Sequence, residues 1–272
     1  MSKVDMHVHT CASDGTWDVY ELKKEIIKNK ISIFSITDHD CIDNVRNMDE
    51  ILSPKDNLVY LHGVELTTEY ENREYHLTLY NYDLNNEELI ELMNSTNNQR
   101  LYSNKEYIEK YASMRYDNVT VEDFERYEYD RRRGGWKSAN YMIDKGIHLD
   151  LFSHLMEVTE SGYKAMLKGA EETMKIAQKS GGKIFLAHPS YHYKNGFMPE
   201  KELKYWLELG IDGVECYSPY NQNSIQYYVD FCKKNDLMIS GGSDCHGSFI
   251  GSRKLGVPEV NLCDLNIKNL LK

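Results

Sequence analysis

The chain lacks the segments and cysteine patterns that would direct it to a membrane or to an oxidising compartment. No apolar stretch approaches the roughly 18 residues that a membrane-spanning helix needs. The first residues, MSKVDMHVHT, do not show the charged-then-apolar pattern of a signal peptide. No C-x-x-C pair is formed by the six scattered cysteines, which are Cys11, Cys41, Cys216, Cys232, Cys245 and Cys263. We therefore expect a cytoplasmic protein with reduced thiols and no membrane association.

Positive charge is also scarce. The chain has 32 Lys and Arg against 43 Asp and Glu, a formal net charge of -11. Stable binding of duplex nucleic acid is not expected, because it requires a basic face. A small phosphate ester is compatible with this charge, since bound divalent cations would offset several of the counted carboxylates.

Metal-binding side chains, in contrast, recur near the ends of apolar, strand-like runs. They occur in seven short motifs: VDMHVHT, ASDGT, SITDHD, HGVELT, REYHLTLY, IFLAHPS and SGGSDCHG. The candidate ligands in these motifs are His7, His9, Asp14, His39, Glu65, His76, His188, Asp244 and His246. Imidazole and carboxylate groups are ligands of divalent transition-metal ions. The pattern therefore predicts a metal-dependent hydrolase.

Strand and helix patterns alternate in both end regions of the chain. Residues 3–9 alternate apolar and polar side chains, which puts His7 and His9 on the same strand face. Residues 17–30 have apolar side chains at helical spacing, with Asp18 near the start as a cap. Further strands are predicted at 31–36, 58–66, 75–82, 183–187, 213–217 and 237–240, and helices at 200–209 and 224–235. Such alternation implies a parallel sheet, and a closed α/β barrel suits 272 residues.

The middle of the chain has a different composition. Residues 84–179 are rich in Asn, Glu, Lys, Tyr and Arg, show helical spacing and have few strand signals. We predict that they form a helical insertion that caps a barrel built from residues 1–83 and 180–272. In such barrels, reactive groups gather at the carboxyl ends of the strands, where the seven motifs are expected to lie.

The order of the motifs resembles that of the PHP phosphoesterases, a superfamily named for polymerase and histidinol phosphatase. H-V-H-T, D-G-T, T-D-H-D, G-V-E-L-T, a lone His on the next strand, L-A-H-P and G-S-D-C-H-G occur in that order, within residues 1–83 and 180–256. The insertion resembles that of the branch containing 3′,5′-nucleoside bisphosphate phosphatases and exoribonucleases. The resemblance implies an α/β fold, a distorted seven-stranded, TIM-like β/α barrel with three divalent metal ions.

The resemblance also implies how these ions would be shared. The first would be held by His7, His9, Glu65 and Asp244, the second by Glu65, His76 and His188, and the third by Asp14, His39 and His246. A bridging carboxylate places two cations roughly 3.5–4 Å apart, so a water between them becomes a hydroxide that attacks phosphorus. Mixed His and carboxylate ligation suits Mn, Fe or Zn better than Mg.

Several residues are expected to act around this centre. Asp14 and Glu65 are the catalytic candidates among the ligands. His192, in PSYHYKNG, is a further catalytic candidate that would touch substrate or shuttle a proton. Asp38, next to His39, is expected to orient an imidazole.

The substrate-binding candidates are less regular. The most cationic run is RYEYDRRRGGWK, in which Arg133 and Lys137 would grip a second phosphate. The alternative is a solvated face that pairs with nearby carboxylates. The nucleotide-phosphatase branch has an R-x-H-x-A pattern here, but alignment on Ala139 leaves Gly135 in place of the Arg and Lys137 in place of the His.

Other pocket candidates lie near the last strands. Tyr217 and Arg253 are expected to bind substrate, and Tyr220 is a second tyrosine that would stack on a base. Glu215 would line the pocket and, in a histidinol phosphate phosphatase, would hold the substrate cation.

The leading hypothesis is a phosphomonoesterase acting on a small phosphorylated metabolite, most specifically a nucleoside 3′,5′-bisphosphate. The alternatives are a 5′-to-3′ exoribonuclease on short RNA, a histidinol phosphate phosphatase, and a non-catalytic, metal-stabilised binding module. An amidohydrolase is disfavoured because no strand-end motif offers a bridging lysine. The sequence leaves the oligomeric state open.

Overall fold

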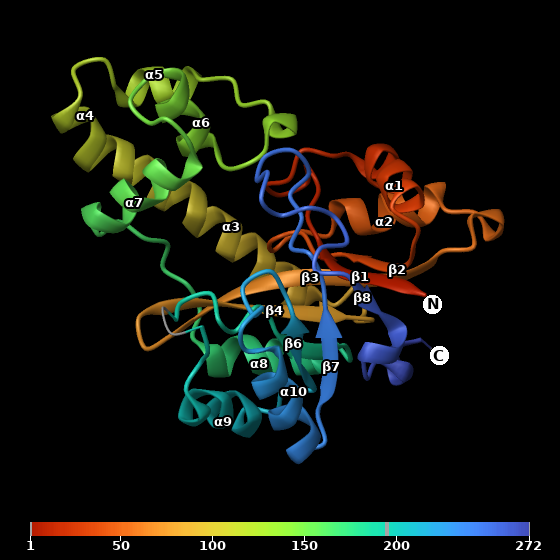
Figure 1. The fold of residues 1–272 in the computed structure, drawn as a ribbon. Coiled ribbons are helices and arrows are strands. Elements are labelled where there is room, and N and C mark those ends of the chain that lie inside the picture. The colour runs from red at the N-terminus through yellow and green to blue at the C-terminus, as the bar shows by residue number, and fades with distance from the viewer. Residues whose placement is uncertain (1, 194–195, 272) are drawn as a thin grey trace.

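The structure, a computed structural model, describes residues 2–193 and 196–271. Its centre is an eight-stranded sheet in the order β7-β6-β5-β4-β3-β2-β1-β8. The strands are β1 (Lys3–Val8), β2 (Ile31–Ile36), β3 (Val59–Tyr70), β4 (Arg73–Tyr80), β5 (Lys183–Leu186), β6 (Gly213–Tyr217), β7 (Met238–Gly241) and β8 (Val260–Asn261). Figure 1 shows this sheet at the middle of the molecule, with helices on its outer sides.

The sheet curls into a nearly closed barrel. The segment after β7 returns to β1, where the His9 amide donates to the Cys245 carbonyl at 2.9 Å and Val8 forms a parallel bridge with Cys245. This confirms the expected α/β barrel. The sheet has one strand more than expected, because the two-residue β8 pairs antiparallel with β1.

The expectation of a parallel sheet is wrong at β4. This strand is antiparallel to both β3 and β5. The cause is the tight turn at Glu71 and Asn72, whose φ angles of 49° and 62° are typical of a two-residue hairpin. As a result β4 begins at the end of the barrel where the parallel strands finish, and His76 near its start joins the other candidate ligands there.

The helices fall into two groups. The barrel is covered by α1 (Val19–Lys28), α2 (Asp43–Ile51), α8 (Ala170–Lys179), α9 (Glu200–Glu208) and α10 (Ile225–Lys234). The second group is α3 (Glu87–Tyr107), α4 (Ser113–Arg115), α5 (Val121–Arg126), α6 (Lys137–Asp144) and α7 (Leu151–Ser161). In Figure 1 the second group rises from the barrel as a lobe, carried by the long helix α3. No described helix has the length and apolar character needed to cross a membrane.

Local sequence explains where several elements begin. The Asp18 carboxylate accepts from the Glu21 amide at 2.9 Å, and Glu21 reaches back to the Asp18 amide at 3.1 Å, so the predicted cap of α1 is a complete capping box. Strand β2 covers Ile31–Ile36, as the apolar run predicts.

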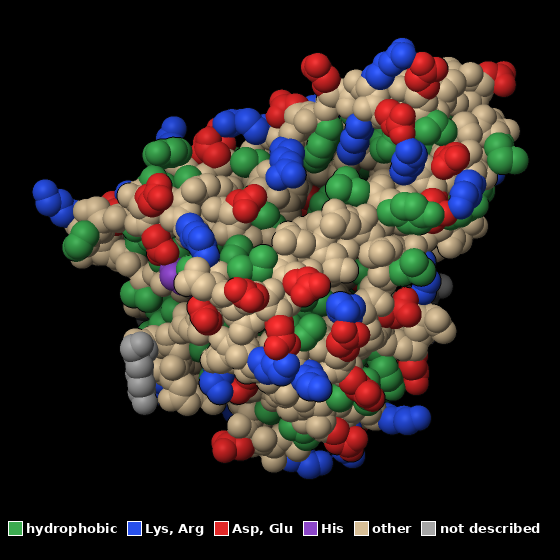
Figure 2. Space-filling view, turned by 180° about the vertical axis from the view of Figure 1, so that it is seen from behind, with side chains coloured by type: hydrophobic (Ala, Val, Ile, Leu, Met, Phe, Trp, Pro, Cys, Tyr) green, Lys and Arg blue, Asp and Glu red, His purple; other side chains and the backbone are tan. Residues whose placement is uncertain are grey.

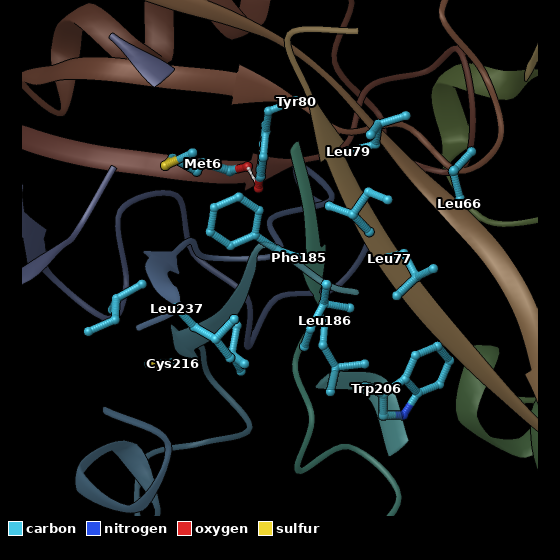
Figure 3. Close-up of a cluster of buried hydrophobic side chains, with 14 of the residues drawn as sticks. Met6, Leu66, Leu77, Leu79, Tyr80, Phe185, Leu186, Trp206, Cys216 and Leu237 are labelled. Atoms are coloured by element: carbon cyan, nitrogen blue, oxygen red, sulfur yellow. Dashed lines mark hydrogen bonds between the residues drawn. The ribbon is translucent and has the colours of Figure 1, made fainter. Parts of the chain in front are cut away.

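The barrel core lies between the sheet and the helices that cover it. In Figure 3, Leu77 from β4 lies beside Leu186 from β5, with which it pairs in the sheet, and the Phe185 ring lies beside Tyr80, with ring centres 5.4 Å apart. The Tyr80 hydroxyl donates to the Met6 carbonyl at 2.9 Å, which satisfies a polar group inside this cluster. The six cysteines are free.

The insertion has a smaller core of its own. Its buried residues are Tyr107, Ile108, Ala112, Val119, Phe124, Tyr141 and Met142. Leu89 near the start of α3 and Met174 in α8 belong instead to the barrel core. Both ends of the 84–179 segment therefore pack on the barrel, and only its middle forms a separate core.

Candidate metal centre and adjoining cleft

Strand β1 brings two imidazoles to the rim of the barrel. The Nε2 atoms of His7 and His9 lie 3.2 Å apart, as the period of two predicts. Both nitrogens face one Oε2 atom of Glu65, at 3.3 and 3.2 Å, and one Oδ1 atom of Asp244, at 3.5 and 3.1 Å. Four ligand atoms, from β1 and the residue after it, from β3 and from the loop after β7, thus lie within 4.8 Å of one another.

Glu65 lies at the centre of the whole arrangement. While Oε2 faces the β1 histidines, Oε1 lies 3.1 Å from His76 Nδ1 and 2.9 Å from His188 Nε2. The Nδ1 atom of His39 also lies 3.2 Å from Oε2. Its two oxygens therefore face different groups of imidazoles, which is the geometry of a carboxylate that can bridge two cations.

A third group forms around Asp14. One carboxylate oxygen lies 3.2 Å from His246 Nε2 and 3.8 Å from His39 Nε2. The other lies 3.4 Å from His9 Nδ1. The structure thus brings all nine candidate ligands of the sequence together, and His9 faces two of the groups.

These side chains fit metal ions better than they fit one another. Among the described residues, the buried atoms His9 Nδ1, His39 Nδ1 and Glu65 Oε2 have no well-oriented hydrogen-bond partner. Buried polar atoms are rarely left in this state. Each of these atoms lies within about 3.5 Å of a nitrogen or oxygen atom of another candidate ligand. The natural interpretation is that they point at shared cations.

The electrostatics of the cluster agree with this view. Burial opposes a charge on His7, but the carboxylates of Glu65 and Glu215 outweigh it and hold the pKa of the imidazole well above its ordinary value. Burial likewise favours neutral Glu65, but the imidazoles of His7 and His76 outweigh it and hold the pKa of that carboxyl well below its ordinary value. The carboxylates therefore stay charged in a buried site, where cations would stabilise them.

Two ligand positions have an uncommon backbone conformation. His188 has φ 24° and Asp244 has φ 50°, in the left-handed region that residues with a side chain seldom adopt. Strain of this kind costs about 1–3 kcal/mol per residue and clusters at functional sites. Here it turns both side chains toward the cluster at the ends of β5 and β7.

A second ring of carboxylates orients the imidazoles. Glu215 accepts from His7 Nδ1 at 2.9 Å and from the His188 amide at 2.7 Å. Glu74 lies 2.9 Å from His76 Nε2, which leaves Nδ1 of that ring facing Glu65. A carboxylate behind a ligating imidazole fixes its tautomer. The prediction that Glu215 lines a substrate pocket is therefore wrong, because this buried side chain is fully used by two ligand residues.

Asp38 also differs from its predicted role. It does not contact the His39 ring but accepts from the Thr10 amide at 2.7 Å and from the Ser13 hydroxyl at 2.6 Å. It therefore fixes the loop that carries Asp14.

A cleft opens beside the cluster, between the barrel and the insertion. Its volume is about 950 Å³, and His39 forms part of its wall. Its wall also includes Asn97 and Arg100 on α3, Arg131, Trp136 and Lys137. The Trp136 ring lies 6.1 Å from the His39 ring, centre to centre. An aromatic surface and several cationic groups thus adjoin the candidate metal centre.

Comparison with known proteins identifies the family to which a chain with this site belongs. The PHP domain model matches residues 5–184, more than half of the chain. The chain belongs to the PHP domain family. It is therefore a metal-dependent phosphoesterase, in agreement with the resemblance of its motifs.

Several relatives of this PHP protein span nearly its whole length. A 5′-3′ exoribonuclease of Haemophilus influenzae is 25% identical over 252 residues, covering 90% of each chain. A 3′,5′-nucleoside bisphosphate phosphatase of Chromobacterium violaceum is 19% identical and covers 95% of this chain and 92% of the relative. The structure of a protein from Bifidobacterium adolescentis, classed as a metal-dependent phosphoesterase, superposes with a TM-score of 0.84 at 23% identity, covering 98% and 95%. This last similarity supports the fold.

The structure separates the predicted phosphate-binding residues of the insertion. Arg133 is engaged by Asp144 through two hydrogen bonds of 2.7 Å, and it does not line the cleft. Lys137 does line the cleft, and its Nζ donates to the Glu125 carbonyl at 3.2 Å. Arg131, a neighbour of Arg133, is in the cleft wall, and within residues 2–193 and 196–271 its side chain donates only to the Ala12 carbonyl, at 3.2 Å.

The two pocket candidates near the last strands also separate. Tyr217 does not line the predicted pocket but a different cavity, together with Cys263 and Asp264. The pairing of β6 and β7 shifts register between Glu215 and Tyr217, which accounts for the different direction of this side chain. Arg253 does reach the cluster, with Nη1 2.8 Å from Asp244 Oδ2. Its guanidinium lies 5.1 Å above the Tyr220 ring.

His192 lies at the edge of the cluster. Its Nε2 is 2.6 Å from the Glu74 carbonyl, and its ring meets Tyr75 edge-on at 5.5 Å. That nitrogen is thus occupied by main chain, and a proton-shuttling role remains a prediction.

Two residues of the cleft were not predicted from the sequence. Arg100 and Trp136 lie 36 positions apart, yet the guanidinium carbon of Arg100 lies 5.0 Å from the centre of the Trp136 ring. The one available signal was a single arginine on the amide-rich helix α3, three residues after Asn97 and four before Asn104.

Proposed function

We propose that this PHP protein hydrolyses the 3′-phosphate of a nucleoside 3′,5′-bisphosphate, releasing a nucleoside 5′-monophosphate and inorganic phosphate. The observation that carries the proposal is the cleft beside the candidate metal centre, in which Arg131 and Lys137 face neutral main-chain oxygens. The proposal explains why a strongly acidic protein keeps such cations next to a cluster of ligands.

In this proposal the nine rim residues hold three divalent ions, Mn, Fe or Zn. The ligand sets are His7, His9, Glu65 and Asp244; Glu65, His76 and His188; and Asp14, His39 and His246. The first matches a group whose donor atoms lie within 4.8 Å of one another, and the third forms such a group together with His9. When bound, such ions would polarise the phosphate and supply an activated water.

Charge at the cleft supports a second phosphate-binding position. Arg131 and Lys137 donate to main-chain carbonyls, so no carboxylate is bonded to either side chain among the described residues. By contrast, Arg132 pairs with Asp18 at 3.0 Å and Glu21 at 2.8 Å. We assign the 5′-phosphate to Arg131 and Lys137, because an arginine or lysine without an acidic partner gains most from a bound phosphate.

The remaining groups bind the rest of the substrate. Trp136 offers an aromatic face between the cleft and His39, suitable for a base or ribose. Arg253, whose Nη1 lies 2.8 Å from Asp244 Oδ2, would contact the 3′-phosphate. In the reaction the 3′-oxygen–phosphorus bond breaks, a water oxygen bonds to phosphorus, and a water proton ends on the 3′-hydroxyl.

A second candidate is exoribonuclease activity on short RNA, favoured by the full-length similarity to the H. influenzae exoribonuclease. The same centre would then cut the first internucleotide phosphate. Figure 2 shows that Lys and Arg side chains are interspersed with Asp and Glu on the face of the molecule that lies behind the view of Figure 1. Such mixed charge argues against a long basic track for a polymer on that face, and the formal net charge of -11 disfavours strong binding of single strands.

The other two alternatives are weaker. A histidinol phosphate phosphatase would want an acidic or aromatic pocket for the substrate cation, and Glu215, the acidic candidate, is bonded to His7 and to the His188 amide. A non-catalytic module would not require all nine ligand-type residues, and these are intact.

The test is phosphate release with Mn²⁺ from adenosine 3′,5′-bisphosphate, AMP, 5′-phosphorylated short RNA and histidinol phosphate. We expect the bisphosphate to be cleaved with the highest kcat/KM. Preference for RNA would replace the substrate by the second candidate. No release from any of these by protein that contains metal would contradict the proposal.

A further inference from the structure

Arg100 occupies an unusual position between the insertion and the metal centre. It projects from α3 with only 12% of its side chain exposed. Among the residues that the structure describes, its side-chain polar contacts are all made by Nη2: the Thr67 hydroxyl by a short hydrogen bond, Asp40 Oδ2 at 3.4 Å and Glu74 Oε1 at 3.7 Å. One guanidinium thus touches β3, β4 and the loop after β2.

Each partner of Arg100 lies one or two positions from a candidate ligand. Asp40 follows His39, Thr67 follows Glu65 by two residues, and Glu74 precedes His76 by two. The other cation of α3, Lys105, pairs instead with Glu125 in the insertion. These neighbouring positions suggest that Arg100 acts on the ligands through the residues beside them.

The link to His76 passes through Glu74. This carboxylate accepts from His76 Nε2 at 2.9 Å, so Nδ1 is directed toward Glu65. However, 47% of the Glu74 side chain is exposed. An exposed carboxylate on its own holds one orientation poorly, because side-chain entropy opposes it. Arg100 provides the nearby cation that holds it in place.

The link to His39 and Glu65 passes through Asp40 and Thr67. The Asp40 carboxylate accepts from the Thr67 amide at 3.1 Å and from the Thr67 hydroxyl at 2.7 Å. The Asp40 amide donates to the Glu65 carbonyl at 2.9 Å. From the helix side, the Asn97 amide group donates to the Asp40 carbonyl at 2.7 Å. Asp40 therefore ties α3 to both ligand-bearing segments.

We propose that Arg100 is a positioning residue that holds the segments bearing His39, Glu65 and His76 in register around the metal ions. The inference rests on the proposed function, since it assumes that these residues bind metal. Its contact with Trp136 also connects this role to the cleft, because movement of the insertion would shift the guanidinium. A lysine is a poorer replacement, since its ammonium lacks the flat guanidinium that lies over the Trp136 ring while Nη2 faces its acceptors.

The experiment compares Arg100→Ala and Arg100→Lys with Arg126→Ala in the full-length protein. Arg126 is a matched control, because it lies in the insertion but pairs with Glu122 in an ion pair that is about three-quarters exposed (76% and 75%). Mn²⁺ stoichiometry and affinity are measured by titration against a chelator, and kcat and KM with adenosine 3′,5′-bisphosphate. Guanidinium chloride at low concentration is then added to Arg100→Ala.

We expect Arg100→Ala to weaken binding of at least one Mn²⁺ by about 10–100-fold, as for other residues that support a ligand. Its kcat should fall by a similar factor with little change in KM, and guanidinium should restore part of it. Arg100→Lys should show an intermediate loss of Mn²⁺ affinity, which keeps the test informative if the alanine variant does not fold.

Two results would overturn the inference. Unchanged Mn²⁺ affinity with a raised KM would make Arg100 a substrate-binding residue, and unchanged Mn²⁺ affinity, kcat and KM would leave it without a role. If the unsubstituted protein binds no Mn²⁺, the proposed function itself fails, which is a distinct outcome.

Discussion

The barrel rim and the insertion cleft contribute to the same site in different ways. At the rim, side chains from six strands or the loops after them meet around Glu65, and every candidate ligand except His76 is buried. In the cleft, the cationic groups come from helix α3, from the short turn Arg131–Arg133 and from the start of α6, and they remain partly open to solvent. The rim is thus positioned by backbone pairing and the cleft by side-chain contacts.

The run of three arginines illustrates what this difference means. Arg131 bonds to a main-chain carbonyl in the cleft, while Arg132 and Arg133 pair with carboxylates outside it. Adjacent residues of one type therefore have different surroundings. At the rim, by contrast, the alternation along β1 is enough to put His7 and His9 on one face.

The strongest test of the rim is Glu65→Gln. The substitution keeps the size of the side chain but removes the negative charge that faces imidazoles on both sides. We expect loss of bound metal and a fall in kcat on the order of 10²–10³-fold, the range found when a preorganised electrostatic group is removed. Metal content by mass spectrometry and kcat by phosphate release check this.

Glu69→Gln is the control on the same strand, because Glu69 pairs with Lys164 at 2.8 Å away from the cluster. Full metal content and activity in Glu65→Gln would show that the carboxylate is not a ligand.

Removal of the metal ions should destabilise the barrel rim more than the insertion. With a chelator, the rim is left with unneutralised buried carboxylates, whereas the insertion core of Tyr107, Phe124 and Tyr141 contains no candidate ligand. A ligand present at a hundred times its Kd stabilises the folded state by about 2.7 kcal/mol, and that contribution is lost on removal. Hydrogen exchange should therefore accelerate in residues 3–9 and 59–70 and change less in residues 107–142. Equal acceleration in both would contradict the comparison.

A smaller effect is expected behind the ligands. Glu215→Gln retains an acceptor for His7 Nδ1 but removes the charge, so metal affinity or kcat should fall by about 10–100-fold. Glu208→Gln, an exposed position at the end of α9, is the control. A change confined to KM would instead restore the earlier interpretation of Glu215 as a substrate residue.

Much of the rim could be predicted from the sequence because its information is local. The apolar run Ile31–Ile36 is a strand, Asp18 caps α1, and His7 and His9 lie at the end of β1 as the motifs predict. Glu65, however, lies in the middle of β3, which continues to Tyr70. The predictions of strand direction and of the substrate pocket are wrong where a tight turn or a register shift redirects the chain. The turn at Glu71 and Asn72 reverses β4, and the register shift after Glu215 takes Tyr217 away from the site.

The cleft was less predictable because the orientation of each cationic side chain depends on partners that are distant in sequence. Whether an arginine faces substrate or a carboxylate depends on residues far away in sequence, such as Asp18 for Arg132. Arg100 depends likewise on β3 and β4. Periodicity carries no information about such pairings, whereas it does determine strand faces.

Arg131→Ala and Arg133→Ala should affect substrate binding differently, although the two arginines are only two residues apart. A hydrogen bond to a charged group contributes about 1.5–3 kcal/mol, so losing Arg131 should raise KM for the bisphosphate by roughly tenfold or more. Arg133→Ala should leave KM unchanged, because Arg133 is bonded to Asp144 and lies outside the cleft wall. The reverse order of effects on KM would mean that the insertion moves on binding and that Arg133 is the phosphate ligand.

The smallest effect concerns the pair of Arg133 and Asp144 itself. Hydrogen bonds from Arg133 and from the Tyr127 hydroxyl lower the pKa of Asp144 from 3.8 to about 2. The stabilisation is therefore complete above pH 3.8 and is lost as the pH falls through about 2. Because 39% and 38% of the two side chains are exposed, it should amount to less than about 1 kcal/mol. NMR titration should show the pKa of Asp144 returning toward its ordinary value in Arg133→Ala. An unchanged pKa would mean that the pair is not formed in solution, and would leave Arg133 available to the cleft after all.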